Sequence, residues 1–247
     1  MIKYINGGIG DILVSLQDAK EAKEIDLYSH FAGAKEMVEN AGVKVNKFVY
    51  YTNKIPEDTP GEQLPFRLFP VFDLPYNVVD ILDKYDIDDK PIIGVHPFGS
   101  NFSRDFWAEK DHPIKNFSNE CIEWLIEELS TSYNIFLYGT CSELDQLRQN
   151  IGSYFFNKNV HLFCNEIWES LASVALCDAV IAADSCIKTM SAILGKPTYV
   201  YLGNYVDHYR DQIFIDPYIR EGVMKVWQFT RPTPQMFKPA INDILSN

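Results

Sequence analysis

The sequence of 247 residues contains few cysteines and no long apolar run. Its five cysteines are odd in number and form no C-x-x-C pair, so they indicate neither a disulfide framework nor a zinc site. No stretch approaches the roughly 18 apolar residues that a membrane-spanning helix needs. The N-terminal MIKYINGGIGDILVSL carries glycines and an acid where a signal peptide has its apolar core. These absences predict a cytoplasmic protein without a transmembrane segment.

Positive charge is also scarce, because 22 lysines and arginines face 34 acidic residues and leave a net charge of -12. A surface of this sign repels polyanions unless a local basic patch overrides the total. Nucleic acid is therefore disfavoured as a partner, and a small or neutral one fits more easily.

What the chain does contain is a regular alternation of strand-like and helix-like segments. In the first part the pattern predicts strands at 3–6, 24–30 and 45–51, with helices at 11–23 and 34–42 between them. Prolines between 52 and 75 predict irregular chain, which a short acidic helix within 73–91 follows.

The second part repeats the alternation with buried-type strands. We expect strands to begin or lie within 91–100, 134–140, 160–164, 178–184, 198–203 and 225–229. Helices are predicted at 118–130, 142–152, 168–177 and 188–195, and a last helix at the C-terminus. This spacing predicts an α/β protein with parallel sheets and right-handed crossovers. We place the domain boundary near Asp89, which gives an unusually small first domain, 1–88, and a second domain, 89–247.

Ligands of open α/β sheets bind beyond the carboxyl ends of the strands, and four strand ends here carry suggestive residues. The first is NGGIGD, where Asp11 stands in the first turn of a helix after three glycines. The alternative is that the glycines only make a tight turn and Asp11 caps the helix.

The second strand end is HPFGS, which ends at Ser100 and is followed by Arg104 and, further on, by Lys115. A hydroxyl, a guanidinium and an ammonium group around one strand end suit a phosphate. An exposed loop with solvated basic groups is the alternative. His96 precedes a proline, and we expect it to be a packed or capping residue rather than a base.

The third and fourth strand ends each open a helix. In YGTCSE, Glu143 could accept hydrogen bonds from a ribose, although a role as a helix-capping acid fits equally. In AADSCIKT, Asp184 or Ser185 caps a helix whose positive end would attract a diphosphate, and Lys188 adds a full charge one turn in. The alternative for this turn is a cap and nothing more.

These segments resemble the heptosyltransferase-type glycosyltransferases, glycosyltransferase family 9, which have the two-domain GT-B fold and use nucleotide-diphosphate sugars. The family's N-terminal G-D with an apolar pair is similar to Gly10-Asp11-Ile12-Leu13. The resemblance implies that Asp11 is the general base that deprotonates an acceptor hydroxyl.

Three further family motifs have counterparts in the second part of the chain. The K-x-W segment resembles Lys115 to Phe117, with phenylalanine in place of tryptophan, and G-x-x-x-E resembles Gly139 to Glu143. The family's D-[ST]-G-x-x-H resembles the stretch that begins at Asp184, with Cys186 where glycine is usual and Thr189 where histidine is usual. The resemblance implies that Lys188 replaces the phosphate contact of that histidine.

The resemblance implies two Rossmann-like domains arranged as in GT-B enzymes. The implied function is inverting, metal-independent transfer of a sugar from a nucleotide-diphosphate sugar to an unidentified acceptor hydroxyl, with no cofactor. Asp11 would be catalytic, and the donor would be bound by Gly10, Ser100, Arg104, Lys115, Glu143, Asp184, Ser185, Lys188 and Thr189. We expect Trp168 in the core rather than in the base pocket.

Other functions remain as alternatives. The first domain has about half the length of the family's acceptor domain, and together with the missing histidine this leaves open a catalytically inactive nucleotide-sugar-binding protein. A metal-dependent transferase is disfavoured, because the D-x-D triplet at 86–88 lies in an acidic linker. A dinucleotide-dependent oxidoreductase is disfavoured by the absence of G-x-G-x-x-G with an acid about 20 residues further on.

Overall fold

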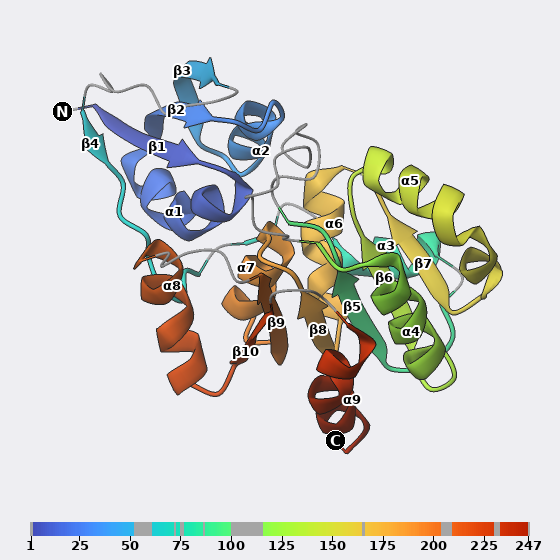
Figure 1. Ribbon diagram of the computed structural model, residues 1–247. Helices are drawn as coiled ribbons and strands as arrows, with labels where there is room; N and C mark the ends of the chain where they lie inside the picture. Colours follow the sequence, from blue (N-terminus) through green and yellow to red (C-terminus); the bar gives the residue numbers. More distant parts are fainter. Residues whose placement is uncertain are drawn as a thin grey trace. The chain divides into compact units, whose positions relative to one another are not determined.

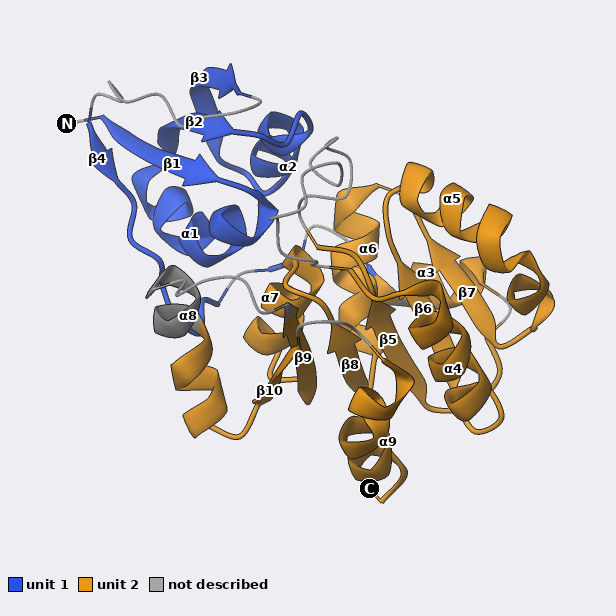
Figure 2. Ribbon diagram, viewed as in Figure 1, with its two compact units in different colours: residues 1–77 blue, residues 78–247 orange. Residues whose placement is uncertain are grey.

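The computed structural model describes most of the chain and divides it into two compact units, 1–77 and 78–247 (Figure 2). The described residues are 2–51, 61–71, 73–74, 77–85, 87–99, 116–164, 166–203, 209–229 and 233–246. Within them, no helix combines the length and the apolar character needed to cross a membrane.

Unit 1 is built on a parallel sheet with the strand order β3-β2-β1-β4 (Figure 1). Its elements are β1 (Lys3–Gly7), α1 (Ile9–Ala22), β2 (Glu24–Ser29), α2 (Ala34–Asn40), β3 (Lys44–Tyr50) and β4 (Glu62–Gln63). The first five confirm the predicted alternation. The strand β4 lies in the proline-containing stretch where no regular structure was predicted. The sequence did not reveal it, because a strand of two residues that pairs with β1 leaves no periodic pattern.

Unit 2 contains a larger parallel sheet with the order β10-β9-β8-β5-β6-β7. Its strands are β5 (Ile92–His96), β6 (Asn134–Tyr138), β7 (Val160–Phe163), β8 (Ala179–Ala182), β9 (Thr198–Gly203) and β10 (Met224–Phe229). Its helices are α3 (Val78–Lys84), α4 (Asn119–Leu129), α5 (Cys141–Ile151), α6 (Ile167–Ser173), α7 (Cys186–Ile193), α8 (Tyr209–Arg220) and α9 (Lys238–Leu245). This is the doubly wound Rossmann order. The alternation predicted the parallel sheet, and the resemblance implied the Rossmann-like architecture.

Helices cover both faces of the sheet of unit 2, and side chains alternate between the faces along each strand. Ile135 and Leu137 of β6 pack into the core formed with α4, α5 and α9. The intervening Phe136 and Tyr138 stack near Phe163 of β7. Burial on both faces explains why the strands are continuous apolar runs in the sequence.

Helix α8 was not predicted from the sequence. Pro217 lies inside it, and a proline normally ends or kinks a helix because it lacks an N–H and clashes with the preceding turn. The helix nevertheless continues past this position, and the N–H of Glu221 donates to the carbonyl oxygen of Pro217 at 3.1 Å.

The division between the units falls before α3, whereas the sequence analysis placed it near Asp89. Helix α3 belongs to unit 2 because it packs on α6. Lys84 Nζ lies 2.7 Å and 2.9 Å from the two carboxylate oxygens of Glu169, a residue that is only 3% exposed. A buried carboxylate needs such a partner, and the acidic composition of the segment gave no sign of it.

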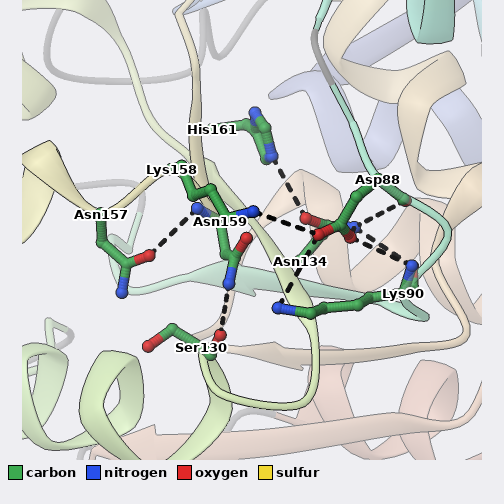
Figure 3. A network of polar contacts seen from close by, with 8 residues as sticks. All are labelled: Asp88, Lys90, Ser130, Asn134, Asn157, Lys158, Asn159 and His161. Carbon is green, nitrogen blue, oxygen red and sulfur yellow. Dashed lines mark hydrogen bonds and ion pairs between the residues drawn. The ribbon is translucent and has the colours of Figure 1, made fainter.

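A polar network lies at the amino edge of this sheet, opposite the carboxyl edge (Figure 3). Asn134, the first residue of β6, donates through Nδ2 to Asp88 Oδ1 at 2.9 Å and to the Lys90 carbonyl oxygen at 3.2 Å. Asn159 donates to the Ser130 carbonyl oxygen at 2.7 Å. The hydrogen bond from the Lys90 N–H lowers the pKa of Asp88. The network therefore fixes the entry to β5, and Asp88 is one of its members.

Aromatic residues cluster on β9 and β10, the two strands at the opposite side of the strand order from β6 and β7. The ring of Trp227 stacks on Tyr201 at 5.1 Å between centroids and on Tyr199 at 6.2 Å. Tyr201 also packs against Phe237 at 4.3 Å, which joins these strands to the C-terminal helix.

Candidate functional site

The topology of unit 2 defines where a ligand would bind. Strands β5 and β8 are neighbours, and the chain leaves them in opposite directions, to β6 on one side and to β9 on the other. Their carboxyl ends are joined by a hydrogen bond from the Ala183 N–H to the His96 carbonyl oxygen at 2.9 Å. This is the switch point at which open α/β sheets bind ligands. The predicted turns that end β5 and β8 therefore flank one position.

The turn after β8 contains a buried ion pair. Lys188 is only 4% exposed, and its Nζ lies 2.6 Å from Oδ1 of Asp184, one helical turn earlier. Because desolvating either charge alone is costly, each charge compensates the other. The pair places a lysine and an aspartate, both predicted as donor-binding, directly at the beginning of α7.

Ser185 is the N-cap of α7, as one of the two predicted alternatives required. Its Oγ accepts from the Lys188 N–H at 3.4 Å, and its carbonyl oxygen accepts from the Thr189 hydroxyl at 3.4 Å. Thr189 is buried, and this hydrogen bond turns its hydroxyl back toward the helix. The cap is therefore real, and a role in binding would come in addition to it.

Cys186, which replaces the glycine usual in the resembling family, is the first residue of α7. Burial raises the pKa of its thiol to about 12, and the nearby carboxylate of Glu143 raises it as well. The N–H groups of Cys186 and Ile187 act in the opposite direction. The thiol therefore lies against the positive end of α7, and it is uncharged at neutral pH.

Glu143 brings the end of β6 to the same place, because its carboxylate is near Cys186. It forms a capping box with Thr140: the Thr140 N–H donates to Glu143 Oε2 at 2.7 Å, and the Glu143 N–H donates to Thr140 Oγ1 at 3.3 Å. Burial raises the pKa of Glu143 more than these hydrogen bonds lower it. Glu143 thus has the capping role that the sequence analysis gave as the alternative to ribose binding.

At the end of β5, Gly99 and Asn116 are the described residues on either side of the segment 100–115. The Gly99 N–H donates to Asn116 Oδ1 at 2.7 Å, and Asn116 is buried. Ser100, Arg104 and Lys115 lie outside the described residues. The sequence analysis did not predict a role for Asn116 in the site, although Asn116 directly follows the predicted Lys115 within PIKNF.

His96 is packed, as predicted, with its ring edge-on to Phe98 at 6.1 Å. Its Nδ1 is buried and has no hydrogen-bond partner among the described residues. Burial lowers the pKa of His96 to about 3, so the ring is neutral at physiological pH. Trp168 is 1% exposed and belongs to the core, which was the expected alternative to a base pocket.

Unit 1 has its own turn at the carboxyl end of β1. Asp11 is in the first turn of α1, next to Gly10, and its Oδ2 accepts from the Gly8 N–H at 2.8 Å. A Cβ at Gly7 would lie 2.1 Å from this oxygen, and Gly7 has a φ of +147°. Only glycine allows this approach between the backbone and the carboxylate. Asp11 is thus held in a fixed place at the end of the strand.

His30, which the sequence analysis did not single out, lies beside the same turn. A Cβ at Gly8 would meet the His30 ring at 2.9 Å and Asp11 Oδ2 at 4.0 Å. His30 follows β2, and Ser29 Oγ donates to the Gly7 carbonyl oxygen at 2.7 Å. The signal available in the sequence was a histidine at the end of the predicted strand 24–30.

Solved structures of three bacterial proteins match the whole chain. ADP-heptose LPS heptosyltransferase II of E. coli is 12% identical, with a TM-score of 0.63 over 100% of this chain and 99% of that one. Heptosyltransferase WaaC of E. coli, solved with ADP, is 11% identical, with a TM-score of 0.56 over 99% and 97%. A family 9 glycosyl transferase of Veillonella parvula DSM 2008 is 9% identical, with a TM-score of 0.56 over 100% and 88%. The chain has a heptosyltransferase-like GT-B fold.

No family model matches the sequence, and no curated protein shows significant sequence similarity. The heptosyltransferase-like fold confirms the resemblance and the two-domain architecture that the sequence analysis stated. At identities this low the likeness concerns the fold, so the roles of individual residues rest on the geometry of each unit. In unit 2 that geometry gathers a buried lysine, two helix N-termini and two carboxylates at one switch point. In the described ranges, no group of three or more metal-ligating side chains is placed to hold a metal ion.

Proposed function

We propose that the protein is a glycosyltransferase that binds a nucleotide-diphosphate sugar at the carboxyl edge of unit 2. The observation that carries this proposal is the Asp184–Lys188 pair at the N-terminus of α7, which lies at the switch point of a doubly wound sheet. Helix N-termini and lysines bind phosphates, and the neighbouring structures include one solved with ADP.

The donor would be held by groups from three strand ends. The diphosphate would lie at the beginning of α7, near Lys188 and Ser185, with Thr189 in place of the histidine of the resembling family. Glu143 would accept from the ribose with the capacity that its capping hydrogen bond leaves, since a carboxylate has several acceptor positions. Ser100, Arg104 and Lys115 would add phosphate contacts, as the sequence predicts.

Asp11, with Gly10 beside it, would serve the transfer itself. Its carboxylate would take the proton of the acceptor hydroxyl as that oxygen attacks the anomeric carbon, and the nucleoside diphosphate would leave from the opposite face. This inverts the configuration. The positive end of α7 and Lys188 would stabilise the departing diphosphate without a metal ion.

A catalytically inactive nucleotide-sugar-binding protein is the second candidate. The Cys186 thiol lies against the N–H groups where a phosphate would bind. A donor that displaces it would bind less tightly than one that meets a glycine.

Binding is tested by thermal unfolding in the presence of ADP, UDP, GDP, CDP and their sugar conjugates. A ligand at 100 times its Kd should stabilise the protein by about 2.7 kcal/mol. Glu143→Gln keeps a side-chain oxygen that accepts from the Thr140 N–H, and it should weaken the binding of the preferred nucleotide about tenfold. The matched control is Glu127→Gln in α4, whose carboxylate accepts from Tyr154. If no nucleotide shifts the transition at millimolar concentration, the donor site is refuted.

Catalysis is tested by release of the nucleoside diphosphate from the preferred donor in the presence of candidate acceptors. Asp11→Asn should abolish release while donor binding stays unchanged. Donor binding without any transfer in the unaltered protein would instead establish the inactive binding protein.

A further inference from the structure

Two thiols meet at the carboxyl edge of unit 2, on the side away from β8. Cys141 is the first residue of α5, and Cys164 directly follows β7. The Cys141 Sγ donates to the Cys164 carbonyl oxygen at 2.7 Å. Burial raises the pKa of the Cys164 thiol, and the neighbouring Cys141 raises it as well.

The backbone keeps these cysteines together independently of their side chains. Strands β6 and β7 are paired in parallel up to Tyr138 and Phe163, and the Gly139 N–H donates to the Phe163 carbonyl oxygen at 3.2 Å. Cys164 follows this last pair immediately, and Cys141 is the first residue of α5, the helix that follows β6. The backbone of the fold therefore holds the two residues next to each other, and a disulfide requires such proximity.

The other three cysteines are placed differently. Cys121 and Cys177 are buried. Burial raises the pKa of Cys177 and of Cys186 to about 12, so both remain protonated. Cys141 is exposed, and an exposed thiol with a second thiol beside it is the arrangement of redox-responsive cysteines.

We propose that Cys141 and Cys164 form a modification site, a dithiol that a peroxide converts reversibly into an intramolecular disulfide. The Cys141 thiolate attacks one peroxide oxygen, the O–O bond breaks, and a sulfenic acid and one water form. The Cys164 sulfur then attacks the Cys141 sulfur and displaces a second water. Two thiols lose two electrons and two protons, and the peroxide is reduced to two waters. A thiol reductant reverses the reaction.

The disulfide would fasten the beginning of α5 to the end of β7. It closes a loop that contains the whole of α5, so the oxidised protein should unfold at a higher temperature than the reduced one. The proposal does not depend on the function proposed above, because its readout is the state of the thiols.

The experiment treats the reduced, full-length protein with hydrogen peroxide and counts thiols after denaturation. Five thiols should fall to three, the intact mass should drop by two hydrogen atoms, and non-reducing peptide mapping should join residues 141 and 164. Dithiothreitol should restore all five.

Variants distinguish this pair from any other. Cys141→Ser and Cys164→Ser should each abolish the crosslink, whereas the control Cys121→Ser, which removes a thiol of α4, should retain it. Five thiols after treatment, or a crosslink between other cysteines, would refute the proposal. Because the count is made on denatured protein, the buried thiols are counted as well.

Discussion

The turns that begin α1 and α7 each position an aspartate at a helix N-terminus, and they do so in different ways. Each follows the carboxyl end of a parallel strand, and each carries an aspartate. At α1 the aspartate lies inside the helix and accepts from the backbone of the N-cap glycine, Gly8. At α7 the N-cap is a serine, and the aspartate precedes it and pairs with a buried lysine.

The carboxylate of Asp11 is therefore oriented by the backbone, whereas that of Asp184 is oriented by a charged side chain. Asp11 is positioned where the chain comes close to it, so its orientation depends on the absence of a side chain at Gly7. Asp184 is positioned by Lys188, and its negative charge is balanced. The first arrangement suits a base, and the second suits a binding site that must stay attractive to a diphosphate.

The largest effect is expected at the pair of α7. Lys188→Met should lower the free energy of unfolding by about 3 kcal/mol, because Asp184 would keep a poorly solvated charge without this partner. The measurement is urea unfolding, with the midpoint and slope compared to the unaltered protein.

The matched variants sharpen this result. The double change Asp184→Asn with Lys188→Met should recover part of the loss, because both charges are then removed. Asp11→Asn at the other turn should cost less than about 1 kcal/mol, because an amide oxygen still accepts from Gly8. If the double variant were no more stable than Lys188→Met, the two side chains would not stabilise each other.

At α1 the sensitive position is a glycine. Gly7→Ala should destabilise the protein by about 2–3 kcal/mol, because a Cβ there meets Asp11 and the backbone has a positive φ. Gly42→Ala is the control: its φ is +86° and nothing lies within 4 Å, so only backbone strain of about 1–2 kcal/mol is expected. Thermal unfolding measures both, and equal losses would show that the approach of Asp11 has no part in the requirement for glycine.

The smallest effect concerns the end of β5 and depends on pH. The pKa of His96 is lowered from 6.5 to about 3 by burial, so below pH 6.5 the unfolded chain binds a proton that the folded protein does not. The contribution of His96 to the free energy of unfolding should therefore decrease by about 1.4 kcal/mol for each unit that the pH is lowered below 6.5. Urea unfolding from about pH 7 to about pH 5 should show a shallower pH dependence in His96→Asn. Parallel curves for the two proteins would contradict the burial of the ring.

Periodicity predicted most of the fold, because strands that are buried on both faces and amphipathic helices leave strong patterns. It did not find α8, where Pro217 breaks the pattern, or β4, which is too short to have one. The boundary depended on α3, which is attached to unit 2 by the ion pair of Lys84 with the buried Glu169 and by the stacking of Tyr85 on Phe163. Such pairings are tertiary facts that no local window contains.

For the site, strand ends predicted which turns would meet, since the carboxyl ends of parallel strands lie at one edge. The sequence could not show that Glu143 would form a capping box or that Lys188 would be buried against Asp184. It also could not bring His30 to Gly8, because that contact depends on the pairing of β1 with β2. Distances between side chains on different elements require the packed structure.

The positions of the tryptophans, among them Trp227 stacked on two tyrosines, have a spectroscopic consequence. All four tryptophans of the sequence lie within residues 78–247, so unit 1 contributes none of the tryptophan emission. Excitation at the red edge of the absorption band therefore reports the unfolding of unit 2 alone, while circular dichroism of the backbone reports both units. Coincident transitions by the two probes would mean that the units unfold as one cooperative body, and separate transitions would give the stability of each in a single experiment.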